Sequence, residues 1–324
     1  MRIALLGCGS IGRRHLRNLR SLDKTDLVAY DPSTKVQNDI EQEFGVSVYH
    51  SLDHVWDQRP DVVLVNSPPN HHLDVGLAAA KNGCHLFIEK PLAHTLVGLD
   101  DLIKEVRNRQ LINMVACNMR FHPGPAMIKK LLDENAIGDV ISARLQFSSY
   151  LPNWRPWQDY RKSYSASSEW GGAILDCIHE IDLALWYFGA GKVAAAVYLP
   201  AKAIGLDTDG LAEIILRHES GVLSNVHVNF VQRDYNRNCQ IVGSEGTIYW
   251  DFNNRNVLVY GSDGKVKDTY NEPENWQLND MYIDELQHFL YHVQHGGEPN
   301  NPIQEGLSTL KIALSAREMN CRLS

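Results

Sequence analysis

Long apolar runs, paired cysteines and an excess of basic charge are all missing from this chain of 324 residues. No segment reaches the ~18 uninterrupted apolar residues of a membrane-spanning helix. The apolar run after Met1 is about five residues long, which is too short for a signal-peptide core. The 6 cysteines are scattered without a CxxC pair, so neither a disulfide framework nor a zinc site is indicated. We therefore expect a cytoplasmic protein with reduced thiols, no membrane association and no metal.

The charge balance argues against another class of function. The chain has 31 Lys and Arg residues against 39 Asp and Glu residues, so its formal net charge is −8. Nucleic-acid-binding proteins normally present a basic face, and we expect no nucleic acid as a partner. An anionic small substrate stays compatible with this balance, because a few local arginines can dominate the charge of a pocket.

Apolar residues make up 44% of the chain, which is enough for two hydrophobic cores. In the first third, short apolar runs alternate with helical patterns. This alternation predicts a parallel sheet with helices on both faces. The expected strands are 3–6, 27–30, 62–65, 85–88 and 112–116, and the expected helices are 11–22, a polar helix ending at Phe44, 70–82 and 96–107.

The pattern changes after residue 118. Several β runs separated by turn signals predict a large, mostly antiparallel open sheet in an α+β domain. The expected helices of this part are 123–135, 173–188, 278–295 and 303–321. We predict two domains, 1–120 and 121–324.

A glycine-rich turn between the first strand and the first helix carries a dinucleotide-binding pattern. Gly7-Cys8-Gly9-Ser10-Ile11-Gly12 is a GxGxxG in the strand–turn–helix context that the motif requires. The first glycine permits a tight turn, the second lets the backbone approach a pyrophosphate, and the third allows close helix packing. Amide groups at the helix N-terminus then face the phosphates. Residues 1–120 are therefore predicted to form a doubly wound Rossmann domain that binds a dinucleotide.

Asp31 ends the second expected strand, about 20 residues after the glycines, where an acidic residue hydrogen-bonds the ribose hydroxyls of NAD. A carboxylate there repels a 2′-phosphate, so NAD is favoured over NADP. The alternative is that Asp31 is a helix N-cap, because Asp31-Pro-Ser-Thr also resembles a helix start.

Three further segments resemble signatures of the Gfo/Idh/MocA family, which is named after glucose–fructose oxidoreductase, inositol dehydrogenase and rhizopine catabolism. They are SPPNHH at 67–72, GCHLFIEKPL at 83–92 with its Glu-Lys-Pro, and GGAILDCIHEID at 171–182. The turn GSEGT at 243–247 is also similar. The resemblance covers essentially the whole chain.

The resemblance implies roles for individual residues. Lys90 is expected near the reacting carbon and the nicotinamide, held by Glu89 and Pro91 across a peptide bond that is often cis in this family. Asp176 and His179 are expected to face the substrate, and Arg120, close to the expected domain boundary, is placed with the substrate-binding residues. The residues expected to line the cofactor are Gly7, Gly9, Ser10, Ile11, Gly12, Asp31, Ser67, Pro68, Asn70, His72, Glu89 and Lys90.

The spacing of the second signature departs from many family members. Asp176 and His179 are three residues apart rather than four, as in a subgroup with a His-Glu-apolar-Asp run. Residues three apart on one helix share a face, so Asp176, His179 and Asp182 would project together. Which of the three meets the substrate is left open.

The chemistry of alcohol oxidation suits these residue types. His179 can accept the hydroxyl proton, since an unperturbed imidazole has a pKa of about 6.5. Lys90 can hydrogen-bond the developing alkoxide, or carry the proton itself if desolvation lowers its pKa. We therefore take Lys90, His179 and Asp176 as the candidate catalytic residues.

A loop rich in aromatic and basic residues, 150–164, precedes the expected substrate helix. Aromatic faces suit a sugar ring, and an arginine suits a carboxylate, sulfonate or phosphate. The alternative is that these side chains pack the loop onto the sheet or form a subunit contact. The candidate substrate-binding residues are Trp154, Arg155, Tyr160, Arg161, Arg233 and Tyr235, besides Arg120, Asp176 and His179.

These observations predict an NAD-dependent oxidoreductase that acts on a secondary alcohol or ketone of a sugar or polyol. The favoured substrate is a pyranose-type sugar, with acidic and nucleotide-linked forms included. One alternative is a glycoside hydrolase or lyase that retains NAD and oxidises the sugar transiently. Another is a non-catalytic protein that senses NAD. No helices are predicted over the outer face of the second sheet, so a homodimer or homotetramer is expected.

Overall fold

The computed structural model describes residues 1–319, which divide into two compact units. The first unit comprises residues 1–118 and 278–307, and the second comprises the remainder. The sequence places 278–307 in the second domain, whereas the structure assigns this segment to the first unit. The end of the expected helix 303–321 and Cys321 lie outside the described residues.

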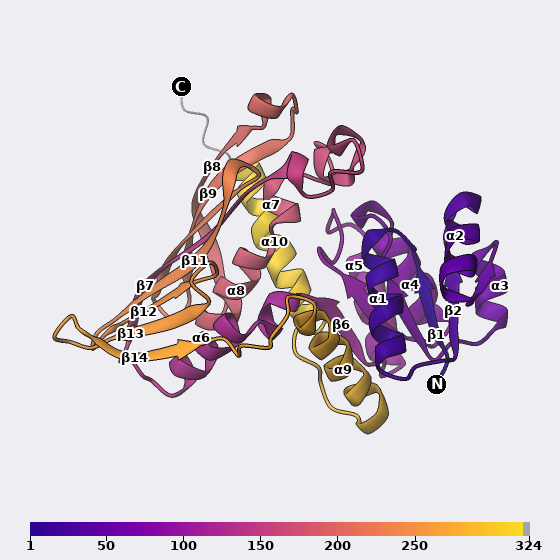
Figure 1. Ribbon diagram of the computed structural model, residues 1–324, viewed down its shortest axis with the longest axis horizontal. Helices are drawn as coiled ribbons and strands as arrows, with labels where there is room; N and C mark the ends of the chain where they lie inside the picture. The colour runs from indigo at the N-terminus through magenta and orange to yellow at the C-terminus, as the bar shows by residue number, and fades with distance from the viewer. Residues whose placement is uncertain (320–324) are drawn as a thin grey trace. The chain divides into compact units, whose positions relative to one another are not determined.

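The first unit is a six-stranded parallel sheet with the strand order β3-β2-β1-β4-β5-β6 (Figure 1). Its central strands are unbroken apolar runs with all residues buried, as expected when helices cover both faces. The five predicted strands are confirmed. The strands are β1 (Ile3–Leu6), β2 (Leu27–Tyr30), β3 (Ser47–Tyr49), β4 (Val62–Val65), β5 (His85–Glu89) and β6 (Asn113–Ala116).

The helices of the first unit are α1 (Ser10–Ser21), α2 (Thr34–Phe44), α3 (Leu52–Asp57), α4 (His72–Lys81), α5 (Leu99–Asn108) and α9 (Asp280–His295). Four of them, α1, α4, α5 and α9, begin within three residues of the predicted positions, and α2 ends at Phe44 as predicted. β3 and α3 were not predicted from the sequence. Both are short, and the edge strand β3 has no buried residue, so neither shows an apolar pattern.

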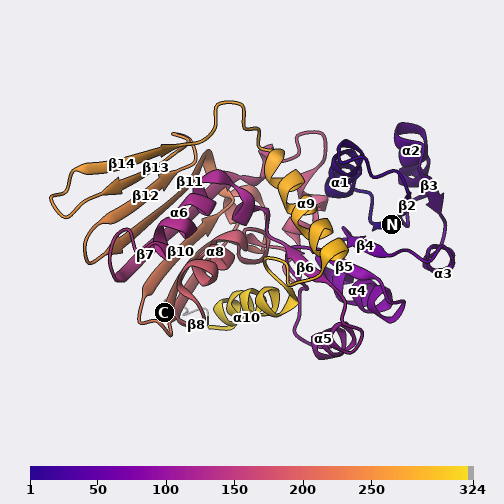
Figure 2. The same ribbon diagram turned by 90° about the horizontal axis from the view of Figure 1, so that it is seen from below.

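The second unit is built on an eight-stranded sheet with the order β14-β13-β12-β11-β7-β10-β9-β8 (Figures 1 and 2). All neighbours are antiparallel except β7 and β10, which run parallel. The predicted mostly antiparallel sheet is therefore confirmed. The strands are β7 (Val140–Tyr150), β8 (Gly191–Pro200), β9 (Asp209–His218), β10 (Leu223–Asn229), β11 (Val231–Gly243), β12 (Thr247–Asp251), β13 (Asn256–Tyr260) and β14 (Val266–Asn271).

Helices cover one face of this sheet. α6 (Pro123–Asp133) packs on β12 and β13, α7 (Ala173–Asp176) on β9, and α8 (His179–Phe188) on β10 and β7. Along β9 the side chains alternate, so that Ala212, Ile214 and Leu216 are buried toward the helices and the residues between them point the other way. The last helix, α10, spans Ile303–Met319.

The prediction of one continuous helix over 173–188 is wrong. α7 ends at Asp176 and α8 begins at His179, with Cys177 between them at ψ 34°. The carboxylate of Asp176 accepts hydrogen bonds from Tyr164 and Ser165 of the preceding loop, which fix the end of α7. The apolar pattern runs through this break, so the sequence could not reveal it.

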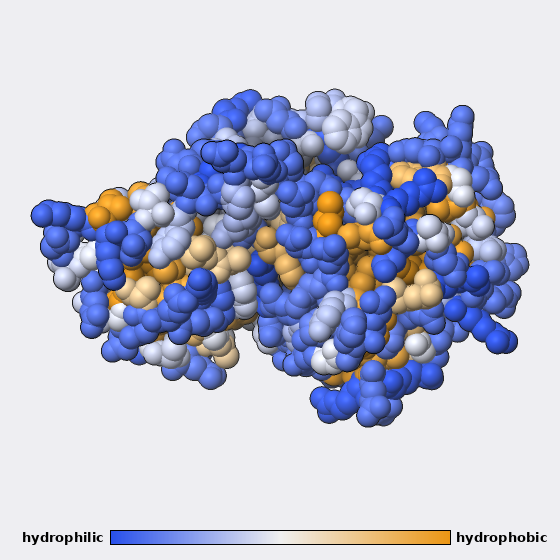
Figure 3. All heavy atoms as spheres, turned by 60° about the horizontal axis from the view of Figure 1, so that its bottom comes forward, coloured by the Kyte–Doolittle hydropathy of each residue, from blue (hydrophilic) through white to orange (hydrophobic). Residues whose placement is uncertain are grey.

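The surface is mixed in polarity. On the face shown in Figure 3, hydrophilic residues cover most of the surface, and apolar atoms show in patches among them. Within residues 1–319, no helix is both long and apolar enough to cross a membrane.

Candidate active site

The glycine turn of the first unit leaves room for a ligand above its backbone. Gly7 has φ 96°, and a Cβ added there would lie 2.7 Å from the backbone of Asn66. A Cβ on Gly12 would collide with the carbonyl oxygen of Gly7, whereas one on Gly9 would meet no atom of the described chain within 4 Å. α1 begins at Ser10 without a side-chain cap, so the first N–H groups of the helix have no intrahelical acceptor. This geometry suits the pyrophosphate of a dinucleotide.

Buried polar atoms without partners lie at the end of β4, directly beside this turn. Within residues 1–319, both amide atoms of Asn66, the hydroxyl of Ser67 and the amide oxygen of Asn70 are buried and make no hydrogen bond. Buried polar atoms are normally paired, so this set of donors and acceptors fits a polar ligand such as a dinucleotide. Asn66 is not among the predicted site residues. Its signal is its position immediately after a buried parallel strand, where ligands bind in such sheets.

Asp31 is buried at the end of β2 and faces the glycine turn. Its two carboxylate oxygens accept hydrogen bonds from the backbone N–H groups of Cys8 and Ser33, both at 2.9 Å. The N-cap of α2 is Ser33, whose side chain accepts from the N–H of Val36. The alternative interpretation of Asp31 as the helix N-cap is therefore wrong. Asp31 links the glycine turn to the end of β2 and the start of α2.

We expect Asp31→Ala to weaken NAD binding roughly 10- to 100-fold, the value of a hydrogen bond to a charged group. The preference for NAD over NADP should narrow at the same time, because the repulsion of the 2′-phosphate is lost. Fluorescence titration of both cofactors measures the two affinities. Asp26→Ala, which changes an exposed aspartate, serves as the control. If the ratio of the affinities for NAD and NADP is unchanged in Asp31→Ala, Asp31 only stabilises the turn and does not contact the ribose.

The turn after β5 carries Lys90, and the Lys90–Pro91 peptide bond is cis. Lys90 is half-buried, and Glu89 before it is buried. The Glu89 carboxylate lies 2.7 Å from Nε2 of His15 on α1. The carbonyl oxygen of Pro91 lies 2.8 Å from Nδ1 of His72, whose Nε2 lies 2.6 Å from the carbonyl oxygen of Ser67.

In the second unit, Asp176 is the last residue of α7, and two side chains of the preceding loop bind its carboxylate. Its carboxylate accepts from the hydroxyls of Tyr164 at 2.5 Å and Ser165 at 2.6 Å. His179 begins α8 and is half-buried. Because the helix is interrupted, Asp176 and His179 do not share a helical face by spacing alone. The sequence analysis did not place Tyr164 among the site residues, although it lies in the aromatic loop that was singled out.

Arg120 and Asp182 form a buried ion pair. Nε and Nη2 of Arg120 each lie 2.8 Å from a carboxylate oxygen of Asp182, and the guanidinium lies over the ring of Trp186. The side chains are 2% and 0% exposed. Of the three residues that share the second signature, Asp182 is thus committed to Arg120, which leaves Asp176 and His179 as the candidates for the substrate.

The aromatic loop is tied to the sheet by several of its predicted substrate residues. Trp154 donates to Ser149 and packs edge-on against Phe147 and Phe230. Tyr160 donates to the carbonyl oxygen of Ile204. The contacts of Trp154 with Ser149 and Phe147 of β7 match the alternative in which the aromatic residues pack the loop onto the sheet, whereas Ile204 lies in the turn between β8 and β9.

The predicted arginines of this unit differ in their surroundings. Arg161 pairs with Asp159 at the surface, and Arg155 lies over the ring of Tyr164. Arg233 is exposed and lies 3.9 Å from the ring centroid of Tyr150. Tyr235 packs edge-on against Phe147. Arg155 is connected through Tyr164 to Asp176, one of the candidate catalytic residues.

Comparison with known proteins identifies a family match in each of the two units. Residues 1–117 match the model of an oxidoreductase family with an NAD-binding Rossmann fold, and residues 126–249 match the C-terminal domain of the Gfo/Idh/MocA family. The chain is 27% identical to myo-inositol 2-dehydrogenase of Thermotoga maritima over 98% of this chain and 96% of that protein. It is 30% identical to levoglucosan dehydrogenase of Pseudarthrobacter phenanthrenivorans over 61% of this chain and 58% of that protein.

The fold agrees with solved structures. A levoglucosan dehydrogenase in complex with NADH and levoglucosan superposes with a TM-score of 0.89 at 21% identity, covering 100% of this chain and 98% of that one. The glycine turn and the two sheets agree with these matches. The chain therefore belongs to the Gfo/Idh/MocA family of oxidoreductases, and its residues 1–117 form the NAD-binding Rossmann domain of that family.

Proposed function

We propose that this protein is an NAD-dependent dehydrogenase that acts on a secondary alcohol of a sugar or polyol. The observation that supports this most is a group of buried polar atoms at Asn66, Ser67 and Asn70 that have no partner within residues 1–319 and lie beside a glycine turn open to a dinucleotide. The same unit carries Lys90 on the turn after the next strand, β5. Relatives named for inositol, apiose and levoglucosan support the substrate class.

The reaction requires two contributions. NAD, when bound, supplies the hydride acceptor. The chain has to move the hydroxyl proton and orient the substrate. In this proposal Lys90 donates a hydrogen bond to the alcohol oxygen and stabilises its developing negative charge, and His179 takes up the proton.

Asp176 has a different role in this proposal. Its carboxylate is buried, and Tyr164 and Ser165 already donate to it. A carboxylate held at the end of α7 by two hydroxyl donors can orient substrate hydroxyls. Tyr164 and Arg155 then belong to the substrate-recognition residues.

The test is NADH formation by the purified protein with NAD and a panel of inositols, pyranoses, anhydrosugars and uronic acids. NADH that accumulates with one substrate class supports the proposal and defines the ring and charge that the protein accepts. Bound NAD without bulk NADH, together with release of an aglycone from a glycoside, would favour the retained-NAD hydrolase instead.

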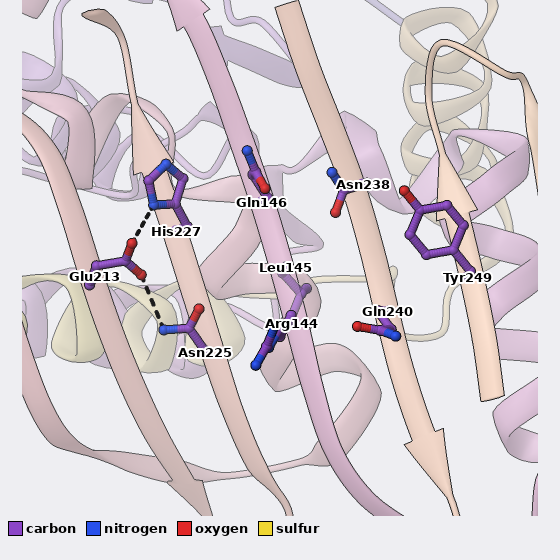
Figure 4. A pocket seen from close by; sticks show the side chains of 9 residues that line it. All are labelled: Arg144, Leu145, Gln146, Glu213, Asn225, His227, Asn238, Gln240 and Tyr249. Carbon is purple, nitrogen blue, oxygen red and sulfur yellow. Dashed lines mark hydrogen bonds and ion pairs between the residues drawn. The ribbon is translucent and has the colours of Figure 1, made fainter. Parts of the chain in front are cut away.

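We further propose that the outer face of the large sheet binds a second copy of the chain. This face lacks the helices that cover the other side, and Figure 4 shows its side chains in front of the strands with the helices behind. It carries an open pocket of about 590 Å³. Glu213 pairs with His227 there at 2.6 Å. The pocket is lined by Arg144, Leu145, Gln146, Glu213, Asn225, His227, Asn238, Gln240 and Tyr249.

Exposed apolar residues lie on the same face. Ile215 lies beside the pocket, opposite Asn225 of β10, and its side chain is 37% exposed. Leu223 and Leu199 are 49% and 54% exposed. In a two-fold interface both copies contribute the same patch, so a central polar pocket flanked by apolar side chains can pair with itself.

We expect Ile215→Lys to convert a homo-oligomer to monomers, because it places a charge in the proposed apolar contact of each copy. Light scattering coupled to size-exclusion chromatography measures the mass. Val97→Lys changes an exposed apolar residue of the first unit and should leave the mass unaltered. A monomeric wild-type protein would contradict the proposal.

A further inference from the structure

We propose that His15 and His72 are positioning residues that hold the Lys90 turn from its two sides and connect it to the two cofactor-binding turns. This inference rests on the proposed catalytic role of Lys90. It follows from one geometric fact. The residue before Lys90 and the residue after it are each held by a different buried histidine.

His15 supports the side of Glu89. It lies in α1, the helix that begins at the glycine turn, and it is fully buried between the rings of Phe87 and Tyr282. Its Nε2 lies 2.7 Å from Glu89, while within residues 1–319 its Nδ1 has no partner. The ring therefore donates from Nε2 to the carboxylate. β4 separates β1 from β5 in the sheet, so this bond connects the glycine-turn helix to the end of a strand that is not its neighbour.

His72 supports the side of Pro91. It is buried in the first turn of α4, and its two nitrogens face the carbonyl oxygens of Pro91 and Ser67. Carbonyl oxygens only accept, so a neutral ring donates to one of them and only a ring that carries both protons would donate to both. Burial lowers the pKa of His72, and the two carbonyl oxygens oppose that shift. The imidazole thus joins the turn after β4, with its unpartnered Ser67 hydroxyl, to the turn that carries Lys90.

The charges of this region are close enough to act on one another. Both Glu89 and Lys90 exert an electrostatic effect on His72 and on Tyr282. The Glu89 carboxylate is therefore part of the electrostatic surroundings of Lys90 as well as an anchor for its backbone. A small displacement of a catalytic group can cost roughly 100-fold in rate, so the two histidines should affect kcat more than cofactor affinity.

The experiment compares His15→Leu and His72→Leu with His15→Gln and His72→Gln, whose amides can still donate to the same oxygens. We expect the leucine variants to lower kcat roughly 10- to 100-fold, with KM and the Kd of NAD changed only a few-fold, and the glutamine variants to recover part of the loss. His85→Leu is the matched control. His85 is a half-buried histidine at the opposite end of β5 that accepts from Ile112, and its loss should lower Tm without altering kcat.

Glu89→Gln provides a second test that does not depend on the folding of the leucine variants. Removing a carboxylate beside Lys90 disfavours its ammonium form. The alkaline midpoint of the kcat–pH profile, where Lys90 loses the proton that it donates in a hydrogen bond, should therefore move to lower pH. A wild-type kcat in both leucine variants, or an unshifted pH profile in Glu89→Gln, overturns the inference while an inactive Lys90→Ala keeps the proposed function. An active Lys90→Ala instead overturns the proposed function itself.

Discussion

Lys90→Ala is expected to reduce kcat by about 1,000-fold or more while leaving the Kd of NAD within a few-fold of the wild type. General acid–base groups contribute roughly 100- to 10,000-fold to a rate. The proposed role also includes stabilising the alkoxide charge, which places the loss in the upper part of that range. The glycine turn, Asp31 and the polar atoms at the end of β4 remain unchanged in this variant, so the cofactor should still bind. Steady-state kinetics with the identified substrate and fluorescence titration of NAD measure the two effects.

Lys81→Ala is the control for this prediction. Lys81 ends α4 and is exposed, so its removal should change neither quantity. Lys90→Arg adds information about the proton, because an arginine keeps the charge and the donor but does not release a proton in this pH range. Full activity of Lys90→Arg would restrict Lys90 to electrostatic stabilisation. Full activity of Lys90→Ala would remove it from the chemistry.

The cofactor-binding part of the site could be predicted because its signals are local in the sequence. The glycine spacing, the acidic residue at the end of β2 and the apolar runs are each set by backbone geometry within one strand–turn–helix unit. Asn66 shows where such reasoning stops. Its position after a buried strand marks the end of β4 as a place where ligands bind, but not which side chain there meets one. That the Asn66 amide has no partner within residues 1–319 becomes visible only once β4 and the glycine turn are packed together.

The substrate-binding part was harder to predict because residue type does not reveal the partner. Arg120 and Arg161 are both arginines near aromatic residues, but one is paired in the interior and the other at the surface. His15 belongs to no motif that the sequence analysis singled out, although it lies three residues beyond the last glycine of the turn. Its partner, Glu89, is 74 residues away. Pairings over such distances depend on the packing of the sheet and helices, which apolar spacing does not encode.

The ion pair of Arg120 and Asp182 leads to the second large effect. We expect Arg120→Met to lower the free energy of unfolding by about 3–5 kcal/mol, because it leaves the Asp182 carboxylate buried without its counter-charge. Arg161→Met is a matched control on the same unit. Arg161 also binds an aspartate through two nitrogens, but at the surface, so its loss should cost less than about 1 kcal/mol. Urea unfolding followed by circular dichroism measures both variants.

The double variant Arg120→Met/Asp182→Leu distinguishes the cost of an unpaired buried charge from the cost of the cavity that the shorter side chains leave. It should be more stable than Arg120→Met alone, because no unpaired charge remains in the interior. Kinetics decide whether Arg120 also contacts the substrate. If it acts only by fixing α8, whose first residue is His179, the variants that fold should lose kcat with little change in KM. A stable Arg120→Met protein with a strongly raised KM would instead make Arg120 a substrate-binding residue, and the ion pair in the structure would then be the arrangement that the substrate displaces.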